Sequence, residues 1–516
     1  MRRGARRWAV LTAASIALTV SPGRAQQPAR PNVVVIMTDD QTLEQMRVMD
    51  ATRALIGDAG VTFENSLVSF PICCPSRATF LTGQYAHNHG VLENEPPTGG
   101  YEAFDHQNSL PVWLQEAGYR TIHVGKFLNG YGEEDPLEIP AGWTEWYGTV
   151  DPSTYRMWGY TINENGALHT YGSIEDEDPA FYQTDVLAAK AVDAVGRAAD
   201  DGEPFFLSFA TLAPHREVTI LAEQSGPRPA PRHKGVFSGE TFPQAPNFNE
   251  QDMSDKPLFM QVKPSLDQPA IEEIDDRYRN ELESLLAVDE AVEAIVAALE
   301  AEGILDETYV IFTSDNGYFH GEHRTPDEKI LAYESGSRVP LLMRGPGIPA
   351  GTVIEEFVAN IDLAPTIVEV ADATAGLAMD GRSLLPFAAE PQRRTLRPLV
   401  IESFMPVGSL LEFFLQQIPL PASHSVALPG PLGDIPLGNA VLPYQAVRTE
   451  RYLYVEYVTG ERELYDLVED PWQMSSAHLD PRYLRTQLAL LLTLERFRLC
   501  AGEACRAEIA PIPDPS

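Results

Sequence analysis

Four short apolar runs that alternate with amphipathic stretches constrain the fold of this chain most strongly. Runs of this length and composition are typical of buried strands, and strands that alternate with helices favour a parallel sheet covered by helices. The clearest helix is predicted at 279–302, where apolar residues recur at helical spacing until Gly303. The pattern predicts an α/β layered domain with a mostly parallel sheet, built on strands at 32–37, 120–124, 205–209 and 309–313.

The C-terminal part of the chain has a different pattern. Its short apolar runs are not separated by clear helical stretches, which is typical of a small antiparallel unit. Two proline-rich segments, 216–270 and 403–443, show no sustained period, and loops of such length are usually functional or mobile. We expect a main domain at 26–390 and a smaller α+β domain at 391–516, with strands at 399–402, 446–448, 452–457 and 462–467.

The first 25 residues have the pattern of a secretory signal peptide. Four arginines precede an apolar core at 8–20, and Gly23-Arg24-Ala25 supplies small residues before a cleavage site after Ala25. A membrane anchor is the alternative, but the apolar core is too short to span a bilayer. We therefore expect an exported protein, periplasmic or secreted, without stable membrane insertion.

The chain is strongly acidic. Its net charge of −36 becomes about −41 once the five arginines of the leader are removed, which leaves 74 acidic residues against 33 basic ones. Such a surface repels nucleic acids and long polyanions, so these are not expected partners. An anionic substrate has to be small and has to find a local group of basic residues.

The cysteines form two close pairs with different expected roles. Export favours a disulfide where geometry permits, and Cys500 and Cys505 are spaced to close a small loop near the C-terminus. Cys73 and Cys74 are adjacent and therefore poor disulfide partners for each other. Their presence calls for another explanation.

Polar residues follow each of the four predicted strands. The carboxyl ends of parallel neighbours meet at one edge of a sheet, where sites form in open α/β sheets. Taken singly, each group has an ordinary interpretation as a turn, a helix cap or a solvated side chain. Together, hard oxygen ligands beside cationic residues indicate a calcium or magnesium site that binds an oxyanion ester. The residues are Asp39, Asp40, Asp315 and Asn316 as ligands, with Lys126, His215 and Lys329 as cations or proton donors.

One motif identifies a family. Residues 73–83, CCPSRATFLTG, contain the pattern C-x-P-S-R-x-x-x-L-T-G, which resembles that of the type I, formylglycine-dependent sulfatases. The position of Pro75 identifies Cys73, and not Cys74, as the cysteine that a formylglycine-generating enzyme oxidises. The resemblance covers nearly the whole mature chain, since Asp39-Asp40-Gln41, Gly125-Lys126 and Ser314-Asp315-Asn316-Gly317 match further family motifs.

The resemblance implies an alkaline-phosphatase-like α/β/α sandwich with its catalytic domain at 26–390. It implies one calcium ion and a hydrated aldehyde at residue 73 whose hydroxyl attacks sulfur, with the leaving oxygen protonated by His215 or Lys329. An unmodified serine lacks the second hydroxyl needed to expel sulfate. The implied calcium ligands are Asp39, Asp40, Cys73, Asp315 and Asn316; Arg77 braces residue 73, Lys126 and Lys329 hold the sulfate, and His87, His89 and His323 are candidates for contact with a sugar.

Finer features resemble the N-acetylglucosamine-6-sulfatases and the extracellular endosulfatases. These are Tyr85-Ala86-His87-Asn88-His89 and Lys126-Phe127-Leu128-Asn129, where Leu128 stands in place of the histidine of the arylsulfatase pattern. We therefore expect hydrolysis of a sulfate monoester on a small sulfated saccharide. The alternatives are an arylsulfatase acting on aryl sulfates, a phosphonate or phosphodiester hydrolase of the same superfamily, and a sulfosugar-binding protein that keeps Cys73 unmodified.

Overall fold

The computed structural model describes residues 30–175, 177–218, 226–404 and 442–515. The predicted signal peptide at 1–25 and most of the segment 403–443 therefore lie outside the described residues. Among the residues that are described, no helix has the length and apolar character needed to cross a membrane.

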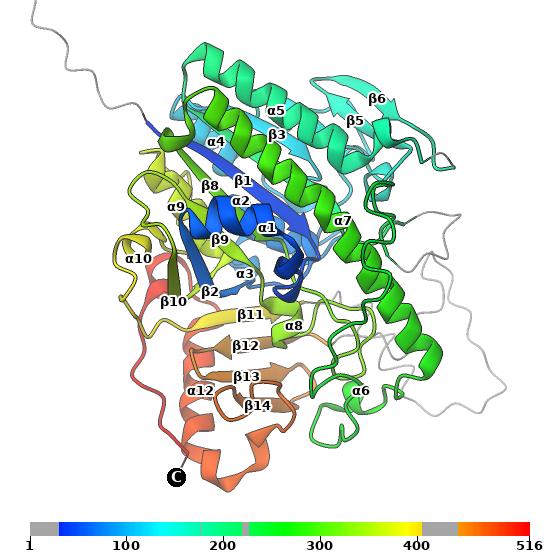
Figure 1. Cartoon of the computed structure of the whole chain (residues 1–516). Helices are drawn as coiled ribbons and strands as arrows, with labels where there is room; N and C mark the ends of the chain where they lie inside the picture. The colour runs from blue at the N-terminus through cyan, green and yellow to red at the C-terminus, as the bar shows by residue number, and fades with distance from the viewer. Residues whose placement is uncertain (1–29, 176, 219–225, 405–441, 516) are drawn as a thin grey trace, which may run out of the picture.

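A ten-stranded sheet forms the centre of the molecule, in the order β10-β2-β9-β8-β1-β7-β3-β4-β5-β6 (Figure 1). Its middle strands β8, β1, β7, β3 and β4 pair in parallel, whereas β9 runs antiparallel between β8 and β2. The mostly parallel sheet is thus confirmed, with all four predicted strands in it. The strands are β1 (Asn32–Asp39), β2 (Val61–Leu67), β3 (Arg120–Gly125), β4 (Glu145–Thr149), β5 (Tyr160–Glu164), β6 (Ala167–Tyr171), β7 (Phe205–Pro214), β8 (Thr308–Ser314), β9 (Leu341–Arg344) and β10 (Thr352–Ala359).

Strand β1 is buried throughout, and its residues 33–37 are all apolar because helices cover both faces of the sheet. Val34 and Ile36 pack in one core with α5 (Gln183–Asp201) and α7 (Gln268–Ala301), and Val33 and Val35 pack in a second core with α2 (Cys73–Thr82), α4 (Leu110–Glu116) and α9 (Leu363–Val370). These three layers are the predicted α/β/α sandwich. The remaining helices of the main domain are short: α1 (Asp50–Thr52), α3 (Ala86–His89), α6 (Leu258–Gln261), α8 (Glu334–Ser337) and α10 (Leu385–Ala389).

Helix α7 begins well before the predicted start at residue 279. Its first residue is Gln268, and the side chain of Asp267 caps the helix by accepting a hydrogen bond from the amide of Ala270. Pro269 stands in the first turn, where backbone amides have no acceptor within the helix, so the amide hydrogen that proline lacks is not needed. The predicted start at residue 279 was wrong, because that prediction used only the spacing of apolar residues. Asp267 and Pro269 are both signals of a helix start.

The C-terminal part forms a separate antiparallel sheet of four strands, β11 (Leu399–Ser403), β12 (Tyr444–Arg448), β13 (Tyr452–Tyr457) and β14 (Arg462–Asp466). Helix α12 (Leu484–Phe497) packs Leu490 and Leu494 against this sheet. Cys500 and Cys505 form a disulfide. The antiparallel unit and the disulfide are confirmed, while the domain boundary near residue 390 stays a prediction.

Candidate active site

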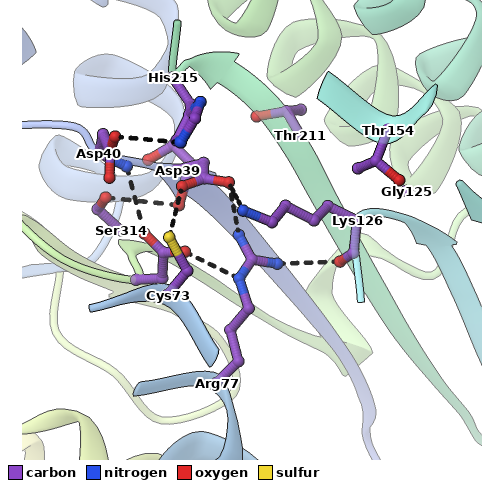
Figure 2. Close-up of polar contacts among 12 residues, drawn as sticks. Asp39, Asp40, Cys73, Arg77, Gly125, Lys126, Thr154, Thr211, His215 and Ser314 are labelled. Atoms are coloured by element: carbon purple, nitrogen blue, oxygen red, sulfur yellow. Dashed lines mark hydrogen bonds and ion pairs between the residues drawn. The ribbon is translucent and has the colours of Figure 1, made fainter. Parts of the chain in front are cut away.

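The polar groups that follow the four strands converge at one edge of the sheet (Figure 2). Asp39 at the end of β1 lies opposite Pro214 of β7, which places His215 beside it. Strand β8 pairs with β1 and ends at Ser314. Strand β3 pairs with β7 and ends just before Lys126. The carboxyl edge of the parallel strands therefore carries the site, as sheet topology requires.

Cys73 is the first residue of α2, a helix that is buried along its whole length. Its sulfur lies 3.4 Å from Oδ1 of Asp39 and 3.0 Å from Nζ of Lys329. Burial, followed by the negative charge of Asp39, raises the pKa of the Cys73 thiol to about 12. The unmodified side chain therefore stays protonated at neutral pH and is a weak nucleophile.

Three buried carboxylates, those of Asp39, Asp40 and Asp315, lie together at this edge. Burial raises the pKa of Asp40 and of Asp315, and the charge of Asp39 adds to the effect at both. Burial also works against the charge of Asp39, but the neighbouring cations, Lys126 foremost, lower its pKa. Ionising all three groups together is therefore costly in the absence of further positive charge.

Arg77 connects these carboxylates to the backbone of Lys126, just after β3. Its Nε donates to Oδ2 of Asp315 over 2.8 Å, and its Nη1 donates to the backbone carbonyl of Lys126 over 2.9 Å. Its Nη2 lies 3.5 Å from Oδ2 of Asp39, which also forms an ion pair with Lys126. This bracing position agrees with the role that the family resemblance implies for Arg77.

Asn316 provides a test of whether the site fits a cation. Its Nδ2 donates to Oδ1 of Asp40 over 2.6 Å, while its own Oδ1 is buried and has no hydrogen-bond partner among the residues that the structure describes. A buried amide oxygen without a donor, beside three carboxylates, fits a hard cation that takes oxygen ligands. Asp39, Asp40, Cys73 and His215 each offer a ligand atom within 4.8 Å of the others. Calcium fits the carboxylate and amide oxygens at this edge of the sheet, whereas the sulfur of Cys73 and the nitrogen of His215 are not ligands that it prefers.

His215 is neutral and has a defined tautomer. Its Nδ1 lies 2.6 Å from the carbonyl oxygen of Arg216, and because a carbonyl only accepts, Nδ1 carries the hydrogen. Its Nε2 lies 3.6 Å from Oδ2 of Asp40. Burial lowers the pKa of the imidazole to about 3. The ring thus presents a lone pair at Nε2, which can accept a hydrogen bond there.

The three histidines predicted to contact a sugar each have hydrogen-bond partners in the protein. Their described hydrogen bonds do not join them to the carboxylate cluster, so their contact with a sugar stays a prediction. Their partners are Glu402 and the Cys500 carbonyl for His87, Thr79 for His89, and Glu250 for His323.

Sequence reasoning missed Tyr155. It ends the short turn Ser153–Tyr155 that follows β4, and its ring centroid lies 4.8 Å from Nζ of Lys126 and 5.2 Å from the ring of His215. No motif marks this residue. Its place follows from the pairing of β4 with β3, and β4 was not among the predicted strands.

The α/β/α sheet and the buried cluster at its carboxyl edge define the class of the protein, a hydrolase with the alkaline-phosphatase-like fold. Comparisons give the family: residues 31–373 match the model of the sulfatase family. The chain is 35% identical to an N-acetylglucosamine-6-sulfatase of Homo sapiens, covering 94% of this chain and 87% of the relative. It is 34% identical to an arylsulfatase of Volvox carteri, with 92% and 76% covered. The chain therefore belongs to the sulfatase family and is a sulfuric ester hydrolase.

Solved structures agree on the fold. A protein solved in complex with its substrate, D-glucosamine-2-N,6-O-disulfate, superimposes with a TM-score of 0.70 at 23% identity, covering 92% of this chain and 98% of the other. A phosphonate monoester hydrolase of Agrobacterium radiobacter superimposes with a TM-score of 0.64 at 21% identity, with 92% and 96% covered. This chain shares its fold with both neighbours. The fold therefore does not decide between sulfate ester and phosphonate hydrolysis, and the residues of the site have to be considered.

Proposed function

We propose that this sulfatase removes the 6-O-sulfate of glucosamine-type sugars, with residue 73 converted to formylglycine and one calcium ion in the site. The observation that carries the proposal is the state of Cys73, a buried thiol whose pKa is raised to about 12 among catalytic groups. Such a thiol is not a competent nucleophile. As the hydrated aldehyde, the modified side chain supplies one hydroxyl for attack and a second through which sulfate is released.

Calcium would be held by Asp39, Asp40, Asp315, Asn316 and residue 73. When bound, it would polarise the sulfate and favour the ionised forms of the three carboxylates. Two observations support this ligand set: the unpartnered Oδ1 of Asn316, and the raised pKa values of Asp40 and Asp315.

The other residues of the site bind sulfate and move protons. Lys126 and Lys329 place two ammonium groups beside residue 73, where they can bind sulfate oxygens through charge-assisted hydrogen bonds. The sequence leaves His215 and Lys329 as alternative proton donors to the leaving alcohol. Because Nδ1 of neutral His215 carries the hydrogen, Nε2 has no proton to give, which favours Lys329 as the donor.

The sugar substrate is supported by two kinds of similarity. The relatives include N-acetylglucosamine-6-sulfatases of Homo sapiens and, at 25% identity, of Bacteroides thetaiotaomicron. Leu128 also matches that group at the position where the arylsulfatase pattern has histidine. Export is supported by a relative named as an extracellular sulfatase homologue of Drosophila melanogaster, 34% identical over 73% of this chain and 33% of its own length. A formylglycine-generating enzyme would then act on the chain during maturation.

Aryl sulfates are a second candidate substrate class, because the chain is also similar to an arylsulfatase of Volvox carteri. The experiment that tests the proposal is a comparison of kcat/KM for N-acetylglucosamine-6-sulfate, its 3-sulfate isomer, 4-nitrophenyl sulfate and an aryl phosphonate. We expect the 6-sulfate to be the best substrate. A better aryl sulfate would overturn the sugar assignment, and a better phosphonate would overturn the reaction class. Binding of the 6-sulfate without turnover would favour the sulfosugar-binding alternative.

A further inference from the structure

Tyr155 contacts both of the residues that handle sulfate and protons on one side of the site. Its ring lies beside Nζ of Lys126 and against the imidazole of His215, at the distances given above. We propose that Tyr155 is a positioning residue that holds Lys126 and His215 side by side. This inference rests on the proposed function, since that function gives Lys126 and His215 their roles.

The sheet places Tyr155 at the same edge as its two partners. Strand β4 pairs in parallel with β3, and β3 pairs in parallel with β7, so the ends of these three strands are adjacent. Lys126 follows β3, His215 follows β7, and Tyr155 follows β4. The ring therefore comes from a third neighbouring strand end and closes one side of the site.

Tyr155 is itself fixed at both ends. Its hydroxyl oxygen accepts a hydrogen bond of 2.7 Å from Nδ2 of Asn129, a residue of the same loop as Lys126. Its backbone carbonyl accepts a hydrogen bond of 3.0 Å from the amide of Val218, shortly after His215. A further bond, from the amide of Gly130 to Asp151, joins the two loops over 2.6 Å. The ring is thus anchored to both segments that it positions.

An aromatic ring suits this position better than an acidic side chain. The face of the ring attracts the ammonium of Lys126 but brings no counter-charge. The positive charge of Lys126 therefore stays available for a sulfate oxygen, whereas a second carboxylate beside Asp39 would neutralise it. The same ring restricts rotation of His215, whose Nδ1 is already fixed on a backbone carbonyl.

The test compares Tyr155→Leu, which removes the ring, with Tyr155→Phe, which keeps it. Tyr171→Leu is the matched control, since the ring of Tyr171 lies 5.3 Å from Nζ of Lys190. With whichever sulfate ester the wild type turns over, Tyr155→Leu should lower kcat about 10- to 100-fold through misplaced groups. KM should rise by a smaller factor, Tyr155→Phe should retain most of kcat, and Tyr171→Leu should leave it unchanged.

A second measurement does not depend on activity. In protein labelled with carbon-13 at the lysine ε position, the ring current of Tyr155 should shift the Lys126 signal, assigned with Lys126→Arg. The shift should persist in Tyr155→Phe and disappear in Tyr155→Leu. Wild-type kcat in Tyr155→Leu, or an unmoved lysine signal, would overturn the positioning role. Failure of the wild type on sugar sulfates alone would overturn only the proposed substrate.

Discussion

Asp362 and Asp39 are both completely buried carboxylates next to arginine, yet their surroundings differ. Both oxygens of Asp362 accept from Arg397, over 2.8 and 2.5 Å, and the amides of Ala359 and Arg382 complete its hydrogen bonds. Asp39 shares its arginine with Asp315 and lies among two further carboxylates. One carboxylate is satisfied by a single arginine and two backbone amides, and the other belongs to a cluster of three carboxylates that share Arg77, Lys126 and Lys329.

This difference distinguishes a structural ion pair from the cluster that we propose as the ligand site. The Asp362 pair joins the residues before α9 to Arg397, which shortly precedes β11, and so connects the main domain to the C-terminal sheet. The active-site cluster keeps an unpartnered amide oxygen on Asn316 and raised carboxylate pKa values. Replacing a residue of the Asp362–Arg397 pair should lower stability, whereas replacing a residue of the Asp39 cluster should lower activity.

The largest effect on this comparison is expected at residue 73. Cys73→Ala should lower kcat/KM by about 10⁴-fold or more, as loss of a nucleophile does in other hydrolases, and should leave the melting temperature nearly unchanged. Cys74→Ala is the matched control, because Cys74 is buried beside it and has no role in the proposed chemistry. Loss of activity in the Cys74 variant but not in the Cys73 variant would contradict the assignment.

Calcium should affect both activity and stability. Chelation with EGTA should abolish turnover, and calcium at about 100 times its Kd should stabilise the wild type by about 2.7 kcal/mol. Asp315→Asn should lose most of this stabilisation, measured as the rise in melting temperature on adding calcium. Asp185→Asn, which changes a surface ion pair with Arg232, should keep it. A calcium response that survives Asp315→Asn would exclude Asp315 as a ligand.

The structural ion pair should behave in the opposite way. Arg397→Leu leaves Asp362 buried and unpaired, and should lower the free energy of unfolding by about 3–5 kcal/mol. The double variant Arg397→Leu/Asp362→Leu should recover part of this loss, because no charge stays buried. Turnover per folded molecule should be close to that of the wild type in both. A specific loss of kcat in a folded variant would remove the distinction between the two clusters.

His87 should have a small, pH-dependent effect on stability. Burial opposes its protonation, but Glu402 outweighs burial and raises its pKa. The charged ring therefore stabilises the fold below its unfolded pKa of about 6.5, and this stabilisation is lost as pH rises through the folded pKa. His87→Gln should lower the melting temperature more in mildly acidic than in alkaline buffer, with KM unchanged. A raised KM would instead support the predicted sugar contact.

The strand ends that build the site were predictable from local sequence, but several strands were not. Strand β1 contains the apolar run 33–37 because both of its faces are buried, and Asp39 is its last residue. Strand β2 exposes Glu64 and lies near one end of the sheet, so its pattern is weak. Strand β9 has four residues, and its antiparallel position between β8 and β2 depends on pairing with distant segments.

The same contrast holds within the site. The residues of the family motifs, such as Asp315 and Lys329, were predicted because short sequence patterns mark them. Tyr155 was missed because its role depends on contacts with two other strand ends. The partner of His323 is Glu250, 73 residues away, and no local pattern indicates such a pair. Sequence motifs therefore predicted the candidate catalytic groups, and the structure was needed to find the residues that we propose position them.

The most direct test of the central claim is the mass of the tryptic peptide 54–77, which ends at Arg77 and contains Cys73 and Cys74. It should be measured on protein exported by its own host, after alkylation of free thiols. Formylglycine at residue 73 predicts a peptide about 18 Da lighter than the cysteine form, or its hydrate, alkylated once at Cys74. A peptide alkylated at both cysteines, from protein that still hydrolyses sulfate esters, would contradict the claim that modified residue 73 is the nucleophile.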